Sequence, residues 1–252
     1  MRVVLLGDSI TQGLGSKKIN FTDELKKRLA PDDIVDNLAL TGTVIDYAES
    51  ILPQVLERHP DFAVILYGNV DAMLKPSRTG KIYERLPHRF TINNGSMLLP
   101  RPFYSSRWYK RIGQHVENSL RTILRKIIFI IDGTEQWMPL EQYRTHYEKV
   151  CSELCSGAII PIICSTVYID DQLFPGSEKE YILYNEWMLE YANKNGFEYI
   201  DLFKSLRDIV KREGWVKYYN CDHFHPNEHG YMIIAKKIAE SIEALKISYS
   251  ER

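Results

Sequence analysis

The feature that most constrains this chain is an apolar run at its start. Val3–Leu6 is followed by the sequence Gly-Asp-Ser-Ile-Thr at residues 7–11. The run predicts a buried β-strand, and Gly7 allows the chain to turn sharply out of it. In an open parallel α/β sheet, ligands bind at the carboxyl ends of the strands, so Ser9 is expected where a substrate can reach it.

Strand and helix patterns alternate along the rest of the chain. The predicted strands are Val3–Leu6, Ile34–Leu38, Phe62–Tyr67, Ala158–Cys164 and Phe197–Ile200. The predicted helices cover residues 21–29, 44–55, 106–131, 139–154, 181–195 and 227–245. This alternation predicts a five-stranded parallel sheet with helices on both faces, an α/β fold of the flavodoxin-like three-layer sandwich type. We expect residues 1–252 to form one domain, with an insertion at residues 75–135.

A second motif lies near the carboxyl end of the chain. Asp222-His223-Phe224-His225-Pro226 offers a carboxylate and an imidazole three residues apart. A serine hydroxyl is a weak nucleophile at neutral pH and needs a base and a group that orients this base. Ser9, His225 and Asp222 therefore have the residue types of an acyl-transfer triad. His223 and His229 are expected to take no part in catalysis.

The two motifs resemble the first and last sequence blocks of the SGNH hydrolase superfamily, the GDSL-type esterases. The resemblance implies a nucleophilic Ser9, a general base His225, and Asp222 to orient it. It also implies an oxyanion hole. The backbone N–H groups of Ser9 and Gly42 would donate to the oxyanion, with Gly42 at the glycine of the second block.

The third block of the family departs from its usual pattern. Gly68 and Asp71 match Gly-x-Asn-Asp, but Val70 occupies the asparagine position and Asn69 lies one residue early. Valine cannot donate a hydrogen bond. Either the backbone turns so that Asn69 becomes the third donor of the oxyanion hole, or the hole uses backbone donors alone.

Composition limits the class of protein. The chain has 252 residues, 44% of them hydrophobic and 26% charged, which suits one large α/β domain. Its apolar runs are shorter than the roughly 18 residues of a membrane span, and its first strand begins too early for a secretory signal. The four cysteines include no Cys-x-x-Cys pair and are expected to be reduced. We therefore predict a cytoplasmic protein.

Charge is distributed unevenly. Residues 75–126 contain twelve Lys and Arg against two acids, so they carry about +10; because the whole chain sums to −1, the remainder carries about −11. This asymmetry suggests an anionic partner such as a glycan or a membrane surface. Nucleic acid is disfavoured because no nucleic-acid-binding motif accompanies the charge. Aromatic residues capable of stacking on sugars lie among the charges: Tyr83, Phe90, Phe103, Tyr104, Trp108 and Tyr109.

The insertion also contains a long apolar stripe. Apolar residues recur every three or four positions from Trp108 to Ile131, which predicts a single amphipathic helix. Such a stripe must be covered. The core is the first candidate, a second subunit of a homo-oligomer is the second, and lipid is the third.

The family resemblance, together with the aromatic and basic insertion, implies an ester hydrolase that removes a small acyl group, in particular acetyl from a carbohydrate, through an acyl-enzyme on Ser9. The alternative is an O-acyltransferase that uses the same triad to acylate a saccharide. A metallohydrolase with Asp222, His223, His225 and His229 as ligands, or an inactive sugar-binding protein, is a weaker alternative. The triad mechanism requires neither a metal nor an organic cofactor.

Overall fold

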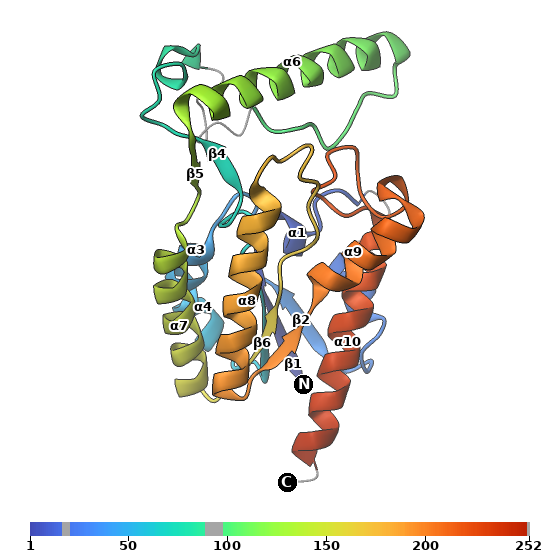
Figure 1. Cartoon of the computed structure of the whole chain (residues 1–252). Coiled ribbons are helices and arrows are strands. Elements are labelled where there is room, and N and C mark those ends of the chain that lie inside the picture. The colour runs from blue at the N-terminus through green and yellow to red at the C-terminus, as the bar shows by residue number, and fades with distance from the viewer. Residues whose placement is uncertain (17–20, 89–97, 251–252) are drawn as a thin grey trace.

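A five-stranded parallel sheet forms the centre of the molecule (Figure 1). The structure is a computed structural model that describes residues 1–16, 21–88 and 98–250. The strands are β1 (Arg2–Gly7), β2 (Ile34–Asn37), β3 (Phe62–Leu66), β6 (Ile160–Cys164) and β7 (Glu198–Ile200). Their order is β2-β1-β3-β6-β7, and every neighbouring pair is parallel. The predicted fold class is confirmed.

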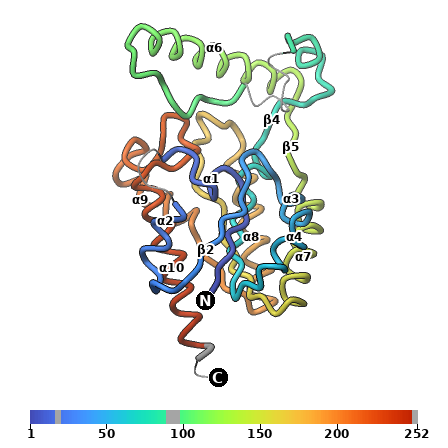
Figure 2. The backbone as a smooth tube through the Cα atoms, turned by 180° about the vertical axis from the view of Figure 1, so that it is seen from behind, coloured from blue at the N-terminus to red at the C-terminus, as the bar shows by residue number. Residues whose placement is uncertain are grey.

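Helices cover both faces of this sheet, as the right-handed connections between parallel strands require. On one face α2 (Phe21–Lys26) packs against α10 (Glu228–Ser250), which also contacts α9 (Leu202–Glu213). On the other face lie α3 (Ile45–Ser50), α4 (Leu52–Leu56), α7 (Leu140–Ser156) and α8 (Ser177–Asn195). In Figure 2, α2, α9 and α10 lie to the left of β2, and α3, α4 and α7 lie to its right. The sheet is fully covered, so β1 and β3 are almost wholly apolar and buried.

Three local predictions need correction. The helix predicted over residues 44–55 is two short helices, α3 and α4, because Pro53 lacks an N–H and cannot continue α3. The strand predicted from Ala158 begins at Ile160, since Ala158 has a positive φ of 58°. Helix α9 was not predicted, although Asp201 caps it by accepting a hydrogen bond from the Lys204 N–H at 2.8 Å.

The insertion forms a separate structure at the carboxyl end of the sheet. Strands β4 (Leu74–Pro76) and β5 (Thr134–Gln136) pair antiparallel and bracket it. A short 3₁₀ turn, η1 (Tyr83–Arg85), and the long helix α6 (Trp108–Asp132) lie between them. In Figure 1, α6 lies across the top of the molecule, above the loops that follow the parallel strands. The prediction of one long helix here is confirmed; Phe90 lies outside the described residues.

The expectation that the core covers the apolar stripe of α6 is wrong. Ile128 is buried, and Leu124 packs in a small cluster with Tyr83 and Leu98. The rest of the stripe faces solvent, including Trp108 at 73% exposure and Ile130 at 83%. A different side of α6, which is polar, contacts the rest of the insertion.

Two further predictions concern the state of the cysteines and the presence of membrane-spanning segments. Cys151, Cys155, Cys164 and Cys221 are all free thiols, and the first and third of them are buried. None of the helices in the described part of the chain has both the length and the apolar character needed to cross a membrane.

Candidate active site

Ser9 is positioned by the turn that follows β1. It is the first residue of the short helix α1 (Ser9–Gln12), and Asp8 caps this helix by accepting a hydrogen bond from the Ile10 N–H at 2.8 Å. Gly7 is required because α1 folds back closely on the strand. A Cβ atom on Gly7 would lie 2.0 Å from Oγ1 of Thr11 and 2.9 Å from the Leu66 carbonyl oxygen. The sequence Gly-Asp-Ser therefore places a hydroxyl at the end of β1, an inner strand of the sheet.

The structure brings the three predicted triad residues together. Oγ of Ser9 lies 3.0 Å from Nε2 of His225, and Nδ1 of His225 lies 2.6 Å from Oδ2 of Asp222. The other carboxylate oxygen of Asp222 accepts hydrogen bonds from the backbone N–H groups of Phe224 and His225, at 3.2 and 3.1 Å. Asp222 is buried, so few waters compete for its carboxylate. This arrangement fixes both the ring and the backbone of His225.

The loop that carries His225 is anchored from two directions. The side-chain amide of Asn220 donates to the carbonyl oxygens of His225 and Pro226, both at 3.0 Å. Gly15, beyond α1, approaches the same loop so closely that a Cβ there would lie 2.5 Å from the Asn220 amide nitrogen and 2.7 Å from the Pro226 oxygen. The segment after Ser9 thus packs directly on the loop that carries His225.

His223 and His229 are separated from the triad. Nδ1 of His223 lies 2.6 Å from Oδ2 of Asp170, and its ring stacks on Trp215 with a centroid distance of 4.8 Å. His229 lies in the first turn of α10. No group of three or more His, Cys, Asp or Glu residues within residues 1–16, 21–88 and 98–250 has the geometry of a metal site. The ligands of the alternative metallohydrolase therefore do not converge.

The candidate oxyanion donors lie in three loops at the carboxyl ends of β1, β2 and β3. Gly42 is exposed in the turn before α3. Among the described residues, the backbone N–H groups of Ser9 and Gly42 have no acceptor. Asn69 is buried, and its Oδ1 accepts from the Val167 N–H at 2.8 Å. Its Nδ2 makes no hydrogen bond of ordinary length within the described chain, although it lies near enough to the Asp8 carboxyl group to lower the pKa of Asp8. Val70 is also buried.

Asp71 joins two of these loops. One of its carboxylate oxygens accepts from the Ile45 N–H at 2.8 Å, and the other accepts from the Gly68 N–H at 2.9 Å. Burial raises the pKa of Asp71 to about 7, while the two hydrogen bonds act in the opposite direction. Asp71 fixes the turn after β3 against the start of α3, close to Gly42.

Asp8 is a second buried carboxyl group at the site. Burial raises its pKa to about 6, against the hydrogen bond from Ile10 and the nearby Asn69 amide, which lower it. Its Oδ2 has no partner of ordinary hydrogen-bond length among the described residues. The residue before Ser9 is therefore held in an environment that disfavours its charge.

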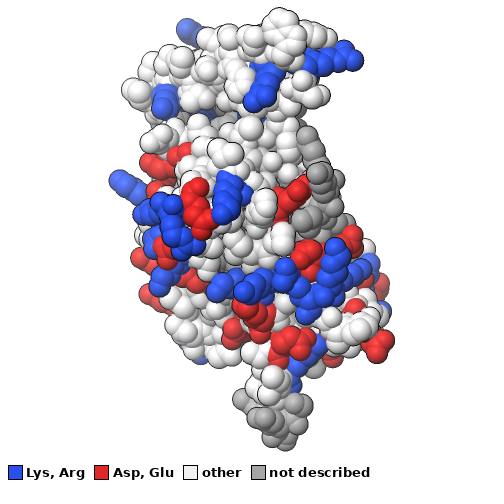
Figure 3. All heavy atoms as spheres, turned by 90° about the vertical axis from the view of Figure 1, so that its right-hand side faces the viewer, with Lys and Arg blue, Asp and Glu red and all other residues white. Residues whose placement is uncertain are grey.

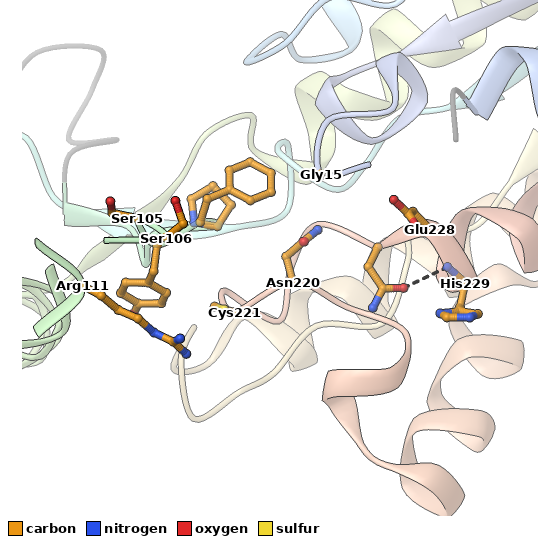
Figure 4. Close-up of a pocket in the computed structure, with 12 residues that line it drawn as sticks. Gly15, Ser105, Ser106, Arg111, Asn220, Cys221, Glu228 and His229 are labelled. Carbon is orange, nitrogen blue, oxygen red and sulfur yellow. Dashed lines mark hydrogen bonds between the residues drawn. The ribbon is translucent and has the colours of Figure 1, made fainter. Parts of the chain in front are cut away.

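Two hollows lie next to the loops that surround the site, one by the loop that carries His225 and one by the Gly42 turn. The larger, of about 480 Å³, lies between the insertion and the loop that carries His225 (Figure 4). Its lining consists of Gly15, Pro102, Phe103, Tyr104, Ser105, Ser106, Arg111, Asn220, Cys221, Asn227, Glu228 and His229. The second, of about 420 Å³, is lined by Gly42, Thr43, Val44, Asp46, Tyr47, Ser50 and Trp137. The first presents aromatic rings, hydroxyls, amides and one arginine, and the second adjoins the Gly42 turn.

Sequence reasoning missed several of these residues. The pair of Asp170 and His223 joins segments 53 residues apart, which no local spacing reveals. The contribution of Asn220 was missed, although it lies only two residues before Asp222. Arg111 was noticed only as part of a basic segment. Its place in the lining of the larger hollow depends on how the insertion folds over the sheet.

Comparison with known proteins agrees with this geometry. The model of the GDSL-like Lipase/Acylhydrolase family matches residues 5–233. The chain belongs to this family. Membership confirms the resemblance seen in the sequence and makes this GDSL protein a carboxylic ester hydrolase. A search of the curated proteins finds no match.

Solved structures of GDSL-type proteins have a similar fold. A catalytic mutant of an acetylxylan esterase from Geobacillus stearothermophilus superposes with a TM-score of 0.61 at 14% identity, covering 96% of this chain and 93% of that one. A lipase/acylhydrolase from Enterococcus faecalis gives 0.61 at 19% identity, covering 97% and 96%. The acetyl xylan esterase AlAXEase gives 0.62 at 16% identity, covering 96% and 100%. At these identities the likeness concerns the fold.

Proposed function

We propose that this esterase removes an acetyl group from an acetylated saccharide through an acyl-enzyme on Ser9. The proposal rests on two contacts. Ser9 Oγ lies 3.0 Å from His225 Nε2, and His225 Nδ1 lies 2.6 Å from Asp222 Oδ2. An Nδ1–H donated to Asp222 leaves Nε2 unprotonated and facing the hydroxyl, which is the tautomer that a general base requires.

The proposed reaction follows from this tautomer. Ser9 Oγ attacks the ester carbonyl carbon while His225 Nε2 takes the hydroxyl proton. The C–O bond to the saccharide then breaks, and His225 returns the proton to the leaving oxygen. Water, deprotonated by His225, attacks the acetyl-enzyme and releases acetate and free Ser9. Asp222 stabilises the imidazolium that forms in each half of the reaction.

The developing oxyanion requires hydrogen-bond donors. The backbone N–H groups of Ser9 and Gly42 are proposed for this role because neither has an acceptor among the described residues. Nδ2 of Asn69 is proposed as the third donor on the same ground. Preorganised donors of this kind contribute about 100- to 1000-fold each to the rate.

The larger hollow supports a saccharide as the substrate. Phe103 and Tyr104 offer ring faces, and Ser105, Asn220 and Asn227 offer hydroxyl and amide groups. Aromatic surface combined with such polar groups suits a sugar ring, which has apolar faces and a hydroxyl rim. Two of the similar solved structures are described as acetylxylan esterases.

Acetate release from acetylated oligosaccharides tests the proposal. The wild-type enzyme should release acetate and Ser9→Ala should not. The measurement is repeated with a free sugar acceptor, because an O-acyltransferase uses the same acyl-enzyme but passes it to a hydroxyl. If less acetate is released when the acceptor is present and acetylated acceptor forms instead, the enzyme is an acyltransferase. If the enzyme hydrolyses a simple acetyl ester but no acetylated saccharide, the proposal of a saccharide substrate is wrong.

A further inference from the structure

Helix α6 turns its apolar side away from the rest of the molecule. We define its outer face by eight residues that are between 44% and 83% exposed: Trp108, Ile112, Val116, Leu120, Ile123, Ile127, Ile130 and Ile131. At 3.6 residues per turn these side chains span an arc of about 140° along the whole helix. A helix at the surface of a soluble protein normally places such an arc against the core.

The opposite side of α6 is polar and is bound to the insertion. Gln114 accepts a hydrogen bond from the Ser105 N–H at 2.6 Å, and Asn118 accepts one from the Arg101 N–H at 2.9 Å. Asp132 accepts from the backbone N–H groups of Ile82 and Tyr83. Because these contacts span the length of the helix, they fix its rotation. The outward position of the apolar face is therefore specified by the sequence.

The exposed basic residues of α6 lie at the edge of the outer face and at the N-terminal end of the helix. Lys126 is at the edge, whereas Arg107, Lys110 and Arg111 lie at the start of the helix, on its other side. The acids of α6 are engaged elsewhere: Glu117 pairs with Arg101 and Arg121, and Asp132 holds the η1 turn. In Figure 3 the end of the molecule formed by the insertion shows white and blue atoms, and red atoms appear only below it.

We propose that the outer face of α6 docks this enzyme on the surface of an anionic lipid bilayer. A helix with an apolar face, basic residues on its polar side and an aromatic residue such as Trp108 lies in the interface of a membrane with its apolar side among the acyl chains. Basic residues beside it attract anionic headgroups. The helix would lie on the membrane and not cross it.

A second copy of the chain fits the outer face less well. A two-fold contact between two outer faces would bring together two copies of residues 75–126 that each carry about +10, which opposes association. The apolar arc of about 140° is also wider than the narrow seam that a two-helix coiled coil buries. An anionic bilayer complements the charge and covers the whole width of the arc.

Co-sedimentation with vesicles tests the docking. The full chain should bind phosphatidylcholine vesicles that contain phosphatidylglycerol, and binding should weaken from 0.1 M to 1 M salt as the Debye length falls from about 10 Å to about 3 Å. The double substitution Ile123→Asp and Ile130→Asp should reduce binding at least tenfold. Lys110→Gln and Lys126→Gln should each reduce it about fivefold at low salt.

Control substitutions lie away from α6. Ile247→Asp, at an exposed apolar position near the end of α10, and Lys236→Gln should leave vesicle binding unchanged. Circular dichroism and hydrolysis of p-nitrophenyl acetate without lipid should be the same for all variants, which shows that they fold. Absence of wild-type binding, or equal binding by the double aspartate variant, overturns the proposal. If the wild type does not bind and forms a dimer that the double variant loses, a second copy covers the face.

Discussion

Asp222 holds His225 at two points. Its Oδ2 lies 2.6 Å from Nδ1 of the ring, and its Oδ1 accepts the backbone N–H of the same residue at 3.1 Å. One buried carboxylate thus sets both the tautomer and the position of the imidazole. The three-residue spacing of the motif allows this only because the chain turns tightly between the two residues.

The first prediction follows from this double contact. Ser9→Ala and His225→Ala should each abolish turnover of p-nitrophenyl acetate, and the double variant should be little worse because triad members act as a unit. Asp222→Asn should lower kcat by about 10⁴, since an amide favours the wrong tautomer of His225. Steady-state kinetics of the four variants provide the measurement.

His223→Ala is the matched control for these variants. His223 pairs with Asp170 and faces away from Ser9, so its loss should leave most of the activity. Full activity in Ser9→Ala, or loss of wild-type activity on chelation, would contradict the triad and favour a metal-dependent reaction.

The second prediction concerns the oxyanion hole. If Nδ2 of Asn69 reaches the oxyanion, Asn69→Ala should lower kcat by about 100-fold or more. Val70→Asn should not raise the rate, because the Val70 side chain is buried. A silent Asn69→Ala together with a faster Val70→Asn enzyme would show that the backbone N–H groups of Ser9 and Gly42 act without Asn69.

The third prediction is a pH dependence of stability that arises from Asp8. Burial raises the pKa of Asp8 to about 6, so between about pH 4 and 6 the folded state retains a proton that the unfolded state has lost. Its contribution to the free energy of unfolding is therefore greatest below pH 4 and falls as pH rises through 6. A shift of about 2 pKa units corresponds to about 3 kcal/mol.

Asp8→Asn isolates this contribution. Asparagine also caps a helix but does not titrate in this range. The free energy of unfolding of the variant, relative to wild type, should rise by up to about 3 kcal/mol from pH 4 to pH 7 in urea titrations. Parallel pH profiles for the two proteins would mean that Asp8 ionises at an ordinary pH.

The fourth prediction concerns Arg125, a residue of α6 whose charged side chain is buried. Its side-chain nitrogens have no hydrogen-bond partner among the described residues, and burial lowers its pKa to about 10. The guanidinium lies 5.1 Å from the Phe174 ring, and this cation–π contact offsets only part of the desolvation. Arg125→Met should therefore raise the free energy of unfolding by about 1 kcal/mol, or the melting temperature by about 2–4 °C.

Arg125→Ala is the comparison that separates charge from packing. Alanine also removes the charge but leaves a cavity, so this variant should be less stable than Arg125→Met. A large destabilisation by Arg125→Met, of about 3 kcal/mol or more, would reveal an anionic partner for the guanidinium.

Much of the fold could be predicted because its signals are local. The buried strands are short apolar runs, and the order of helix and strand leaves few topologies for a parallel sheet. Ser9, Asp222 and His225 were found together because each lies in a short motif whose geometry depends on neighbouring residues. The break between α3 and α4 follows from Pro53, a local signal that the apolar spacing obscured.

Other features depend on long-range packing. The outward face of α6 contradicts the ordinary rule that an amphipathic stripe marks the buried side. It is fixed by hydrogen bonds that Gln114, Asn118 and Asp132 accept from the backbone of segments that carry no recognisable pattern. Similarly, the buried environments of Asp8 and Asp71 arise from the convergence of three loops, which the sequence alone does not display.

The last prediction concerns the part of the insertion that lines the larger hollow. Arg111 is the basic residue of α6 in that lining, whereas Arg107 has the same charge but does not contribute to it. If the hollow holds the saccharide, Arg111→Gln should raise KM about fivefold for an acetylated saccharide that carries a carboxylate, with little change in kcat. Arg107→Gln should have a smaller effect, and neither variant should alter hydrolysis of neutral p-nitrophenyl acetate. The difference between the substrates should vanish at 1 M salt because the charge is screened. Equal effects of Arg111→Gln and Arg107→Gln on both esters at every salt concentration would show that the basic residues form a solvated surface without a role in substrate choice.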